Sequence, residues 1–329
     1  MQDLRQLPKL RDSLSYLYVE HARIDRHEKS VSFRDATGET PIPCASLSLL
    51  MLGPGTTITH AAVAALADNN CLVAWCGEEG VRFYAHGTGG TRSAAALLHQ
   101  ARLVSEESAR LEVCKRLYQM RFHEEVDPTL TLEQLRGWEG RRVREAYARA
   151  ARETGVFWQG RNYDRGVWGV ADPVNRALSA ANACLYGICH AAILSLGFSP
   201  ALGFIHTGKQ LSFVYDVADV YKTVVTIPTA FRCAAEGSSG VERRTRLACR
   251  DTFQQNCLLD RLAEDIPRAL GLRREDAEAL FAVDADAALP GSLWDPDRAS
   301  GAEGGVNYGD PHPGAGLPQP AGRADPLAD

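Results

Sequence analysis

Residues 203–222 read GFIHTGKQLSFVYDVADVYK and place one histidine and two aspartates within fourteen residues. The glycines at 203 and 208 predict a loop that carries His206, and the apolar-rich run 213–222 predicts a helix. Asp216 and Asp219 are three residues apart, so both carboxylates lie on one face of that helix. Most of their neighbours are apolar, and two acids on a packed helix require a cation or a base to compensate their charge.

Two explanations of this acidic pair remain open from the residues alone. Lys222 follows Asp219 by three residues and could pair with it on a solvated helix face. A divalent metal ion is the other explanation, because Mg²⁺ and Mn²⁺ prefer oxygen ligands and Mn²⁺ also accepts an imidazole. His206 taken alone is more typical of a core histidine. Its position just before an apolar helix with two acids favours a metal site next to a phosphodiester.

A single glutamate upstream, Glu139, interrupts the arginine-rich stretch LRGWEGRRVR at 135–144. It could form an ordinary helix-surface ion pair with Arg142, three residues on. The flanking glycines at 137 and 140 are poor helix formers and permit close approach of a ligand, which favours a third metal ligand. Arginines recur at 243–250, and cations alternate with aromatic residues at 161–168, a pattern typical of phosphate and base contacts.

The apolar periodicity changes along the chain and predicts an α+β fold. Short runs rich in β-forming residues predict strands at 14–19, 31–33, 47–52, 71–75 and 81–85, separated by turns at 36–38, Pro41, Pro43 and 53–55. Thr59 predicts the start of one short helix over 61–67. Spacings of three and four then predict helices over 93–122, 130–153, 173–196, 213–222 and 241–265. We therefore expect a β-rich N-terminal domain (1–86), a hinge (87–92), a mainly α-helical C-terminal domain (93–288) and a disordered tail (289–329).

Composition leaves a nucleic-acid enzyme possible despite the net charge of −5. Seven acids and two bases from Asp286 onward account for that whole charge, so the rest of the chain is balanced and its basic clusters decide the local field. The nine cysteines form no CxxC pair, as expected of reduced thiols in the cytoplasm. No apolar run of eighteen residues and no signal-peptide pattern is present, so we expect neither a membrane span nor export.

Longer motifs carry a resemblance to a known family. They are PGT at 54–56, HAAV at 60–63, GVR at 80–82, EQLRG with EG at 133–140, CLYG at 184–187, GFIHTGK at 203–209, LSFVYDVA at 211–218 and RLACRD at 246–251. On these motifs the chain resembles the Cas1 family of CRISPR adaptation integrases, in its type I-E form, up to about residue 285. The resemblance implies a catalytic set of Glu139, His206, Asp216 and Asp219. In that set Glu139, His206 and Asp216 hold Mg²⁺ or Mn²⁺, and Asp219 lies behind them with Lys222.

The resemblance also implies the substrate and the partners. Such enzymes insert a DNA duplex with 3′ overhangs, the prespacer, into CRISPR repeat DNA by 3′-hydroxyl attack, as an antiviral defence. They act in the cytoplasm as a homodimer that joins the Cas2 protein in a heterohexameric complex. His21 stands where the family has an aromatic that stacks on the duplex end. We nominate as DNA contacts Arg82, Arg136, Tyr163, Tyr186, Lys209, Tyr215, Lys222, Arg246 and Arg250. Two other functions remain open, a catalytically silent DNA-binding scaffold and a metal nuclease without integration.

Overall fold

The computed structural model describes residues 16–28, 30–42, 44, 47–78, 83–87, 89, 94–122, 125–127, 129–161, 172–273, 275–276 and 293–297. Contacts between residues divide the chain into two units, Met1–Ala285 and Asp286–Asp329, and the sheets and helices belong to the first. Arg82 and Tyr163 lie outside the described residues, as do most of the predicted hinge and nearly all of the predicted tail. The predicted domain boundaries therefore stay predictions.

The first of two N-terminal sheets has the strand order β1-β5-β7-β8, over Tyr16–Val19, Leu49–Leu52, Leu72–Cys76 and Phe83–Gly87. β1 pairs with β5 and β5 with β7 in parallel, whereas β8 is antiparallel to β7. Every residue of β5 is buried, which explains why its sequence is a continuous apolar run. The strands predicted over 14–19, 47–52, 71–75 and 81–85 are thus confirmed where the structure describes them, from Tyr16 and from Phe83 in the first and last case.

The second sheet has the order β4-β3-β2-β6, over Gly38–Ile42, Ser30–Asp35, Arg23–His27 and Thr57–Ile58. The prediction that Pro41 marks a turn is wrong, because Pro41 lies inside β4. β4 is an edge strand, where the missing proline N–H costs no ladder hydrogen bond. Helix α1 (His60–Asp68) begins where predicted, with the Thr59 hydroxyl accepting a hydrogen bond from the Ala62 N–H at 3.3 Å.

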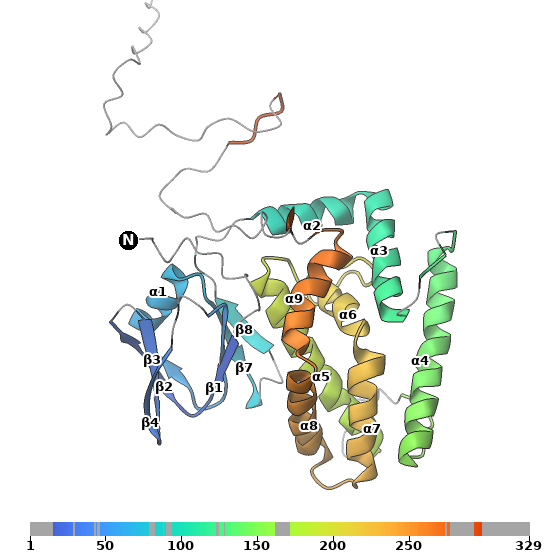
Figure 1. The fold of residues 1–329 in the computed structure, drawn as a ribbon, viewed down its shortest axis with the longest axis horizontal. Helices are drawn as coiled ribbons and strands as arrows, with labels where there is room; N and C mark the ends of the chain where they lie inside the picture. The colour runs from blue at the N-terminus through green and yellow to red at the C-terminus, as the bar shows by residue number, and fades with distance from the viewer. Residues whose placement is uncertain are drawn as a thin grey trace, which may run out of the picture. The chain divides into compact units, whose positions relative to one another are not determined.

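The long helix predicted over 93–122 is instead two helices, α2 (Ala95–Ser105) and α3 (Glu107–Phe122), which meet at a clear angle in Figure 1. Glu106 between them has an extended backbone (φ −96°, ψ 117°), which ends α2. The break lets Leu103 of α2 and Leu117 of α3 join one apolar core. The three- and four-residue spacing continues across the break, so it gave no sign of the change in direction.

Helices α4 (Leu132–Thr154) and α5 (Pro173–Ser195) confirm two predictions. Thr131 and Gln134 form a reciprocal capping box at the start of α4, and Asp172 caps α5. Among the described helices, α5 alone is long and apolar enough to cross a membrane, but 61% of its most apolar window is buried inside the structure. Its Ala191 packs with Leu49 and Leu72 of the first sheet, so α5 contributes to cores on both sides.

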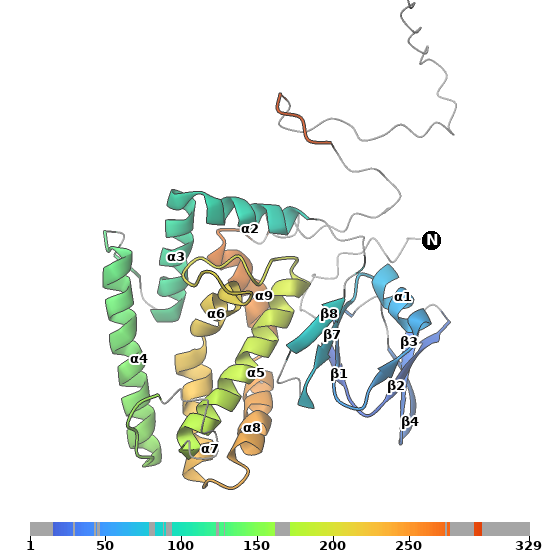
Figure 2. The same ribbon diagram turned by 180° about the vertical axis from the view of Figure 1, so that it is seen from behind.

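The chain then runs through α6 (Ser212–Asp219), a π-helical segment (Lys222–Thr226) and α7 (Ile227–Ala235), and α6 and α7 pack along α5 (Figures 1 and 2). The helix predicted over 213–222 ends as α6 at Asp219. The helix predicted over 241–265 is divided into α8 (Val241–Gln255) and α9 (Leu258–Ala269), because Cys257 adopts a positive φ of 46°. Apart from these breaks, the described residues have the predicted fold class, two β-sheets followed by a helical region.

Candidate metal centre

The loop that carries His206 folds tightly against the start of α6. A Cβ atom on Gly203 would lie 2.7 Å from the Cβ of Ser212 and closer still to the carbonyl oxygen of His206, so only glycine fits there. The Ser212 hydroxyl accepts from the Lys209 N–H at 3.0 Å and donates to the Lys209 carbonyl at 2.8 Å. These contacts hold the loop backbone against the start of α6, without a contribution from the His206 side chain.

Asp216 is fully buried and accepts hydrogen bonds from the backbone of this loop. Its Oδ2 accepts from the backbone N–H groups of Phe204 (2.6 Å) and Ile205 (3.2 Å), and its Oδ1 accepts from the backbone N–H of His206 (2.9 Å). Oδ1 also contacts His206 Nδ1 at 2.8 Å. Three backbone donors and one imidazole thus compensate the burial of this carboxylate.

The Asp216 contact fixes the orientation of the His206 ring. With Nδ1 held by Asp216, Nε2 points the other way and lies 4.0 Å from Asp219 Oδ2. The hydrogen bond that Asp216 accepts raises the pKa of His206, against an opposing effect of burial. The His206 side chain is 43% exposed, so Nε2 belongs to an accessible face.

Asp219 has different partners, all of them side chains. Burial by itself would raise the pKa of Asp219, but Lys222 and Arg121 outweigh it and lower that pKa. Lys222 Nζ lies 2.6 Å from Oδ1, and Arg121 Nη1 lies 3.2 Å from Oδ2. Oδ1 is buried, and its partner is the Lys222 ammonium.

Arg121, at the end of α3, also forms a very short ion pair with Oε1 of Glu139 on α4. Arg142, the other partner considered for Glu139, has its guanidinium 5.0 Å from the centre of the Phe122 ring. Arg121 is only 8% exposed and bridges two acids from different helices. The structure therefore brings Glu139 and Asp219 together on one guanidinium, with His206 beside Asp219 and Asp216 behind His206.

Sequence reasoning missed Arg121, although a signal was present. Cys114, Leu117 and Tyr118 are buried on α3, and the same spacing places Arg121 next on that face. An arginine on a buried helix face needs a partner, and two acids supply it.

The nominated DNA contacts fall into two groups. Tyr186 and Tyr215 lie at the site, with their rings 5.1 Å apart, and Tyr215 lies 5.8 Å from the His206 ring. Lys222 is also at the site, but it is held by Asp219 and lies 4.9 Å from the Tyr186 ring centre. Burial would lower the pKa of Lys222, yet Asp219 and Tyr186 raise it. Its charge is thus already compensated within the protein.

The second group is on exposed surface. Arg136 on α4 and Lys209 in the loop are exposed. Arg246 on α8 pairs with Glu78 at 3.6 Å and lines a cavity of about 190 Å³ together with His21. Arg250 pairs with its neighbour Asp251 at 2.9 Å. These residues contribute to a surface rather than to the group around Arg121.

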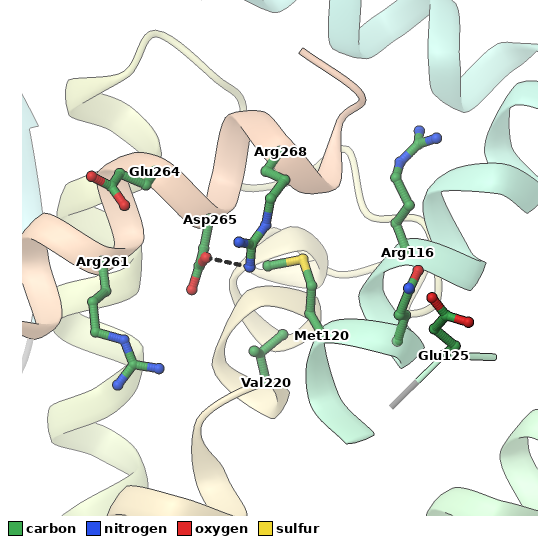
Figure 3. A pocket seen from close by; sticks show the side chains of 9 residues that line it. Arg116, Met120, Glu125, Val220, Arg261, Glu264, Asp265 and Arg268 are labelled. Carbon is green, nitrogen blue, oxygen red and sulfur yellow. Dashed lines mark ion pairs between the residues drawn. The ribbon is translucent and has the colours of Figure 1, made fainter. Parts of the chain in front are cut away.

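A larger cavity of about 710 Å³ lies between α3 and α9 (Figure 3). None of the four predicted catalytic residues lines it. Its charged lining residues carry both signs, and Arg268 and Asp265 pair across 2.7 Å, as Figure 3 shows. The predicted chemistry therefore does not use this cavity.

The donor set around Arg121 suits a divalent ion in its chemistry. Two carboxylates and an imidazole are ligands that Mn²⁺ accepts, and two carboxylates suit Mg²⁺. As they stand, no three acids, histidines or cysteines among the described residues are close enough together to hold an ion. The reason is local, because the Arg121 guanidinium separates Glu139 from Asp219. The residues fit a metal site in which a protein cation holds the central position.

Comparison with known proteins places this geometry in a family. The model of the CRISPR associated protein Cas1 family matches residues 15–126 and 118–242. The CRISPR-associated endonuclease Cas1 2 of Thermus thermophilus is 56% identical over 324 residues, 98% of each chain. The CRISPR-associated endonuclease Cas1 of Escherichia coli is 44% identical over 254 residues, which cover 77% of this chain and 83% of that relative. The crystal structure of a TtCas1–DNA complex superposes with a TM-score of 0.74 at 59% identity and covers 80% of this chain and 99% of the other.

The family model thus spans well over half of the chain, and one close relative covers nearly all of it. This chain belongs to the Cas1 family of CRISPR-associated endonucleases.

Proposed function

We propose that the protein is the metal-dependent integrase of CRISPR adaptation, which inserts prespacer DNA into a CRISPR repeat by 3′-hydroxyl attack. The observation that carries the proposal is the convergence of Glu139 and Asp219 on one buried positive charge, with His206 Nε2 4.0 Å from Asp219. A site that already accommodates a cation between two carboxylates, with an imidazole beside it, is chemically prepared for a divalent metal. We propose Mg²⁺ or Mn²⁺ as that metal.

The geometry favours Asp219 over Asp216 as the metal ligand, the reverse of the sequence-based hypothesis. Both Asp216 oxygens already accept hydrogen bonds from the loop, and they can bind a metal only if that loop opens. Asp219 is held by side-chain cations, which can move without a change in the backbone. We therefore assign Glu139, His206 and Asp219 as ligands and Asp216 as the residue that orients His206.

The residues divide the work of the reaction. When bound, the metal supplies Lewis-acid stabilisation of the charge that develops on the phosphate oxygens. Asp216 keeps His206 Nε2 aimed at the site, and Lys222 keeps a positive charge beside Asp219. In the joining step the 3′-oxygen of the incoming DNA bonds to a phosphorus of the repeat, and the bond to the repeat's own 3′-oxygen breaks. That oxygen leaves as a new 3′-hydroxyl after taking up a proton.

DNA would be held by the two groups of nominated residues. Tyr186 and Tyr215 present rings at the site on which unpaired bases can stack. The exposed Arg136, Lys209 and Arg250 and the partly buried Arg246 would bind phosphates, and Arg82 and Tyr163 stay nominated from sequence alone. Support comes from the relative that is described in complex with DNA. The type I-E form, a homodimer, assembly with Cas2 and a cytoplasmic location also remain part of the proposal, and the E. coli relative at 44% identity is consistent with the first.

A half-site joining assay tests the proposal. The full chain with its Cas2 partner, Mn²⁺ and a prespacer duplex should form a covalent product with CRISPR repeat DNA. Glu139→Gln should remove the product while leaving duplex binding intact, because the change removes a charged ligand and preserves the shape. Glu133→Gln is the matched control, since Glu133 is exposed on the same helix. Duplex binding without joining by the unmodified chain at every metal concentration would favour the silent scaffold.

A further inference from the structure

Arg121 connects parts of the chain that are distant in sequence. It is the final basic residue of α3, and its guanidinium contacts Glu139 on α4 and Asp219 on α6. All three side chains are largely buried, with 8%, 23% and 11% exposure respectively. A single Nη1 atom makes both contacts, so one NH2 group of the guanidinium contacts both carboxylates.

We propose that Arg121 is a built-in counter-ion which occupies the metal position of this site and must be displaced when a divalent ion binds. The proposal rests on the metal site of the proposed function. A divalent ion held by Glu139 and Asp219 would need oxygen contacts of about 2.1 Å. The Nη1 group contacts the same two oxygens, so a guanidinium and a metal cannot occupy the position together.

The charges explain why such a counter-ion is useful. Glu139 and Asp219 place two carboxylates against one guanidinium, and in the absence of a metal only cations of the protein can balance them. Lys222 holds the Oδ1 atom of Asp219, and Arg121 holds the Oδ2 atom that faces His206. Each oxygen of the Asp219 carboxylate is thus paired with a different cation. Displacement of Arg121 would free the metal-facing oxygen while Lys222 stays in place.

Two measurable consequences follow. Metal binding has to break the Arg121 ion pairs, so the measured affinity is lower than the carboxylates and imidazole alone would give. The same ion pairs stabilise the metal-free protein, so their removal should harm the metal-free form more than the loaded form. A permanent structural ion pair would behave differently, because its removal would destabilise both forms equally and leave metal affinity unchanged or weaker.

The test uses the purified full chain and Mn²⁺ alone, with no DNA and no activity readout. Calorimetry gives the Mn²⁺ dissociation constant, and thermal unfolding is followed in EDTA and in saturating Mn²⁺. Arg121→Gln should bind Mn²⁺ about tenfold more tightly, the effect expected when one competing buried ion pair is removed. Its melting temperature should fall in EDTA and recover more than that of the unmodified chain on addition of Mn²⁺. Arg121→Lys, which keeps a positive charge, should bind Mn²⁺ nearly as weakly as the unmodified chain.

Arg116→Gln is the matched control. Arg116 is on the same helix and its guanidinium donates to the Ala269 carbonyl at 2.8 Å, away from the site carboxylates. Its loss should lower the melting temperature by the same amount in EDTA and in Mn²⁺ and leave Mn²⁺ affinity unchanged. If Arg121→Gln behaves like this control, or binds Mn²⁺ more weakly, the counter-ion proposal is wrong.

The inference and the proposed function can fail separately. Glu139→Gln should reduce Mn²⁺ binding strongly if the metal site is correctly placed. If Glu139→Gln has no effect on Mn²⁺ binding, the metal site itself is wrong. If Glu139→Gln reduces binding while Arg121→Gln changes nothing, the metal site stands and only the role of Arg121 is refuted.

Discussion

The surroundings of Asp216 and of Asp219 differ sharply, although these two acids are three residues apart on the same helix. Asp216 accepts hydrogen bonds from the backbone of the neighbouring loop, within thirteen residues of chain. Asp219 is neutralised by the side chains of Arg121, from another helix, and of Lys222. A backbone donor cannot leave without unfolding its loop, whereas a side-chain cation can rotate away. The same residue type, buried at both positions, is therefore held by fixed backbone donors in one case and by movable side-chain cations in the other.

Removal of the Asp216 carboxylate tests this difference between the two acids with the largest expected effect. In Asp216→Ala, the backbone N–H groups of the loop lose their acceptors, and each buried unsatisfied donor costs about 1–3 kcal/mol. We expect the free energy of unfolding, measured with urea in EDTA, to fall by about 3–5 kcal/mol after partial relaxation. Asp219→Ala should cost less than half as much, because Arg121 keeps Glu139 and Lys222 keeps the Tyr186 ring. Equal losses would show that the two acids do not differ in role.

We expect the joining rate to depend more on Asp219 than on Asp216, which is the reverse of their expected effects on stability. Asp219→Asn keeps the shape of the side chain and removes the charge that would bind the metal. We expect a loss of joining rate of about 100-fold or more, the size typical of a lost group that stabilises transition-state charge. The measurement is the initial rate of half-site joining in Mn²⁺, with the melting temperature as a check of folding. Asp219→Asn that joins at the normal rate would return the ligand role to Asp216.

The loop that serves Asp216 can be strained without touching any charge. In Gly203→Ala the added methyl group meets the backbone carbonyl of His206 and the side chain of Ser212, so the loop must shift. Such overpacking costs about 1–3 kcal/mol, which urea unfolding can resolve. Gly137→Ala is a matched contrast, because a Cβ atom there meets open space inside a helix. That variant should be neutral or stabilised by up to about 1 kcal/mol.

Two histidines extend the comparison to pH, with the smallest expected effect. Asp216 raises the pKa of His206, whereas burial against Phe83, with ring centres 4.0 Å apart, lowers the pKa of His190 to about 4. The unfolded chain therefore binds a proton at His190 more readily than the folded chain between pH 6.5 and 4. Stability from His190 is complete above pH 6.5 and is lost as the pH falls through that range.

His190→Gln tests that sign. The difference in unfolding free energy between pH 7.5 and pH 5 should be about 1 kcal/mol smaller in the variant than in the unmodified chain, after allowance for partial exposure of the ring. Urea unfolding at both pH values measures the difference. A larger pH dependence in the variant would contradict the lowered pKa of His190.

Much of the fold was predictable because it depends on local patterns. Strand β5 is a continuous apolar run, and Thr131 and Asp172 are recognisable helix caps. The breaks at Glu106 and Cys257 were not predictable, because they are backbone conformations that leave the apolar spacing unchanged. The family and its class of enzyme, endonuclease, followed from long motifs and are confirmed by the relatives.

The site was predictable in membership but not in roles. Spacing alone brought His206, Asp216 and Asp219 together, and the resemblance added Glu139. The aspartate proposed to bind a metal is the one whose oxygens are not hydrogen-bonded to the loop backbone. Tertiary hydrogen bonds decide which one that is, and the sequence pattern does not show them. Arg121 could have been found from its place on a buried helix face, since the periodicity that identified the helix also identified that face.

The π-helical segment Lys222–Thr226 determines which face of the following helix, α7, is buried. The Ile227 N–H donates to the Lys222 carbonyl, five residues back, so this wide turn contains one more residue than a regular helical turn spans. If the same residues formed a regular α-helix instead, the extra residue would rotate the following helix by about 100°. Phe231, now fully buried, would then leave the core. The wide turn thus keeps Phe231 on the buried side of α7, even though Val224 within the segment is half exposed and contributes little to packing.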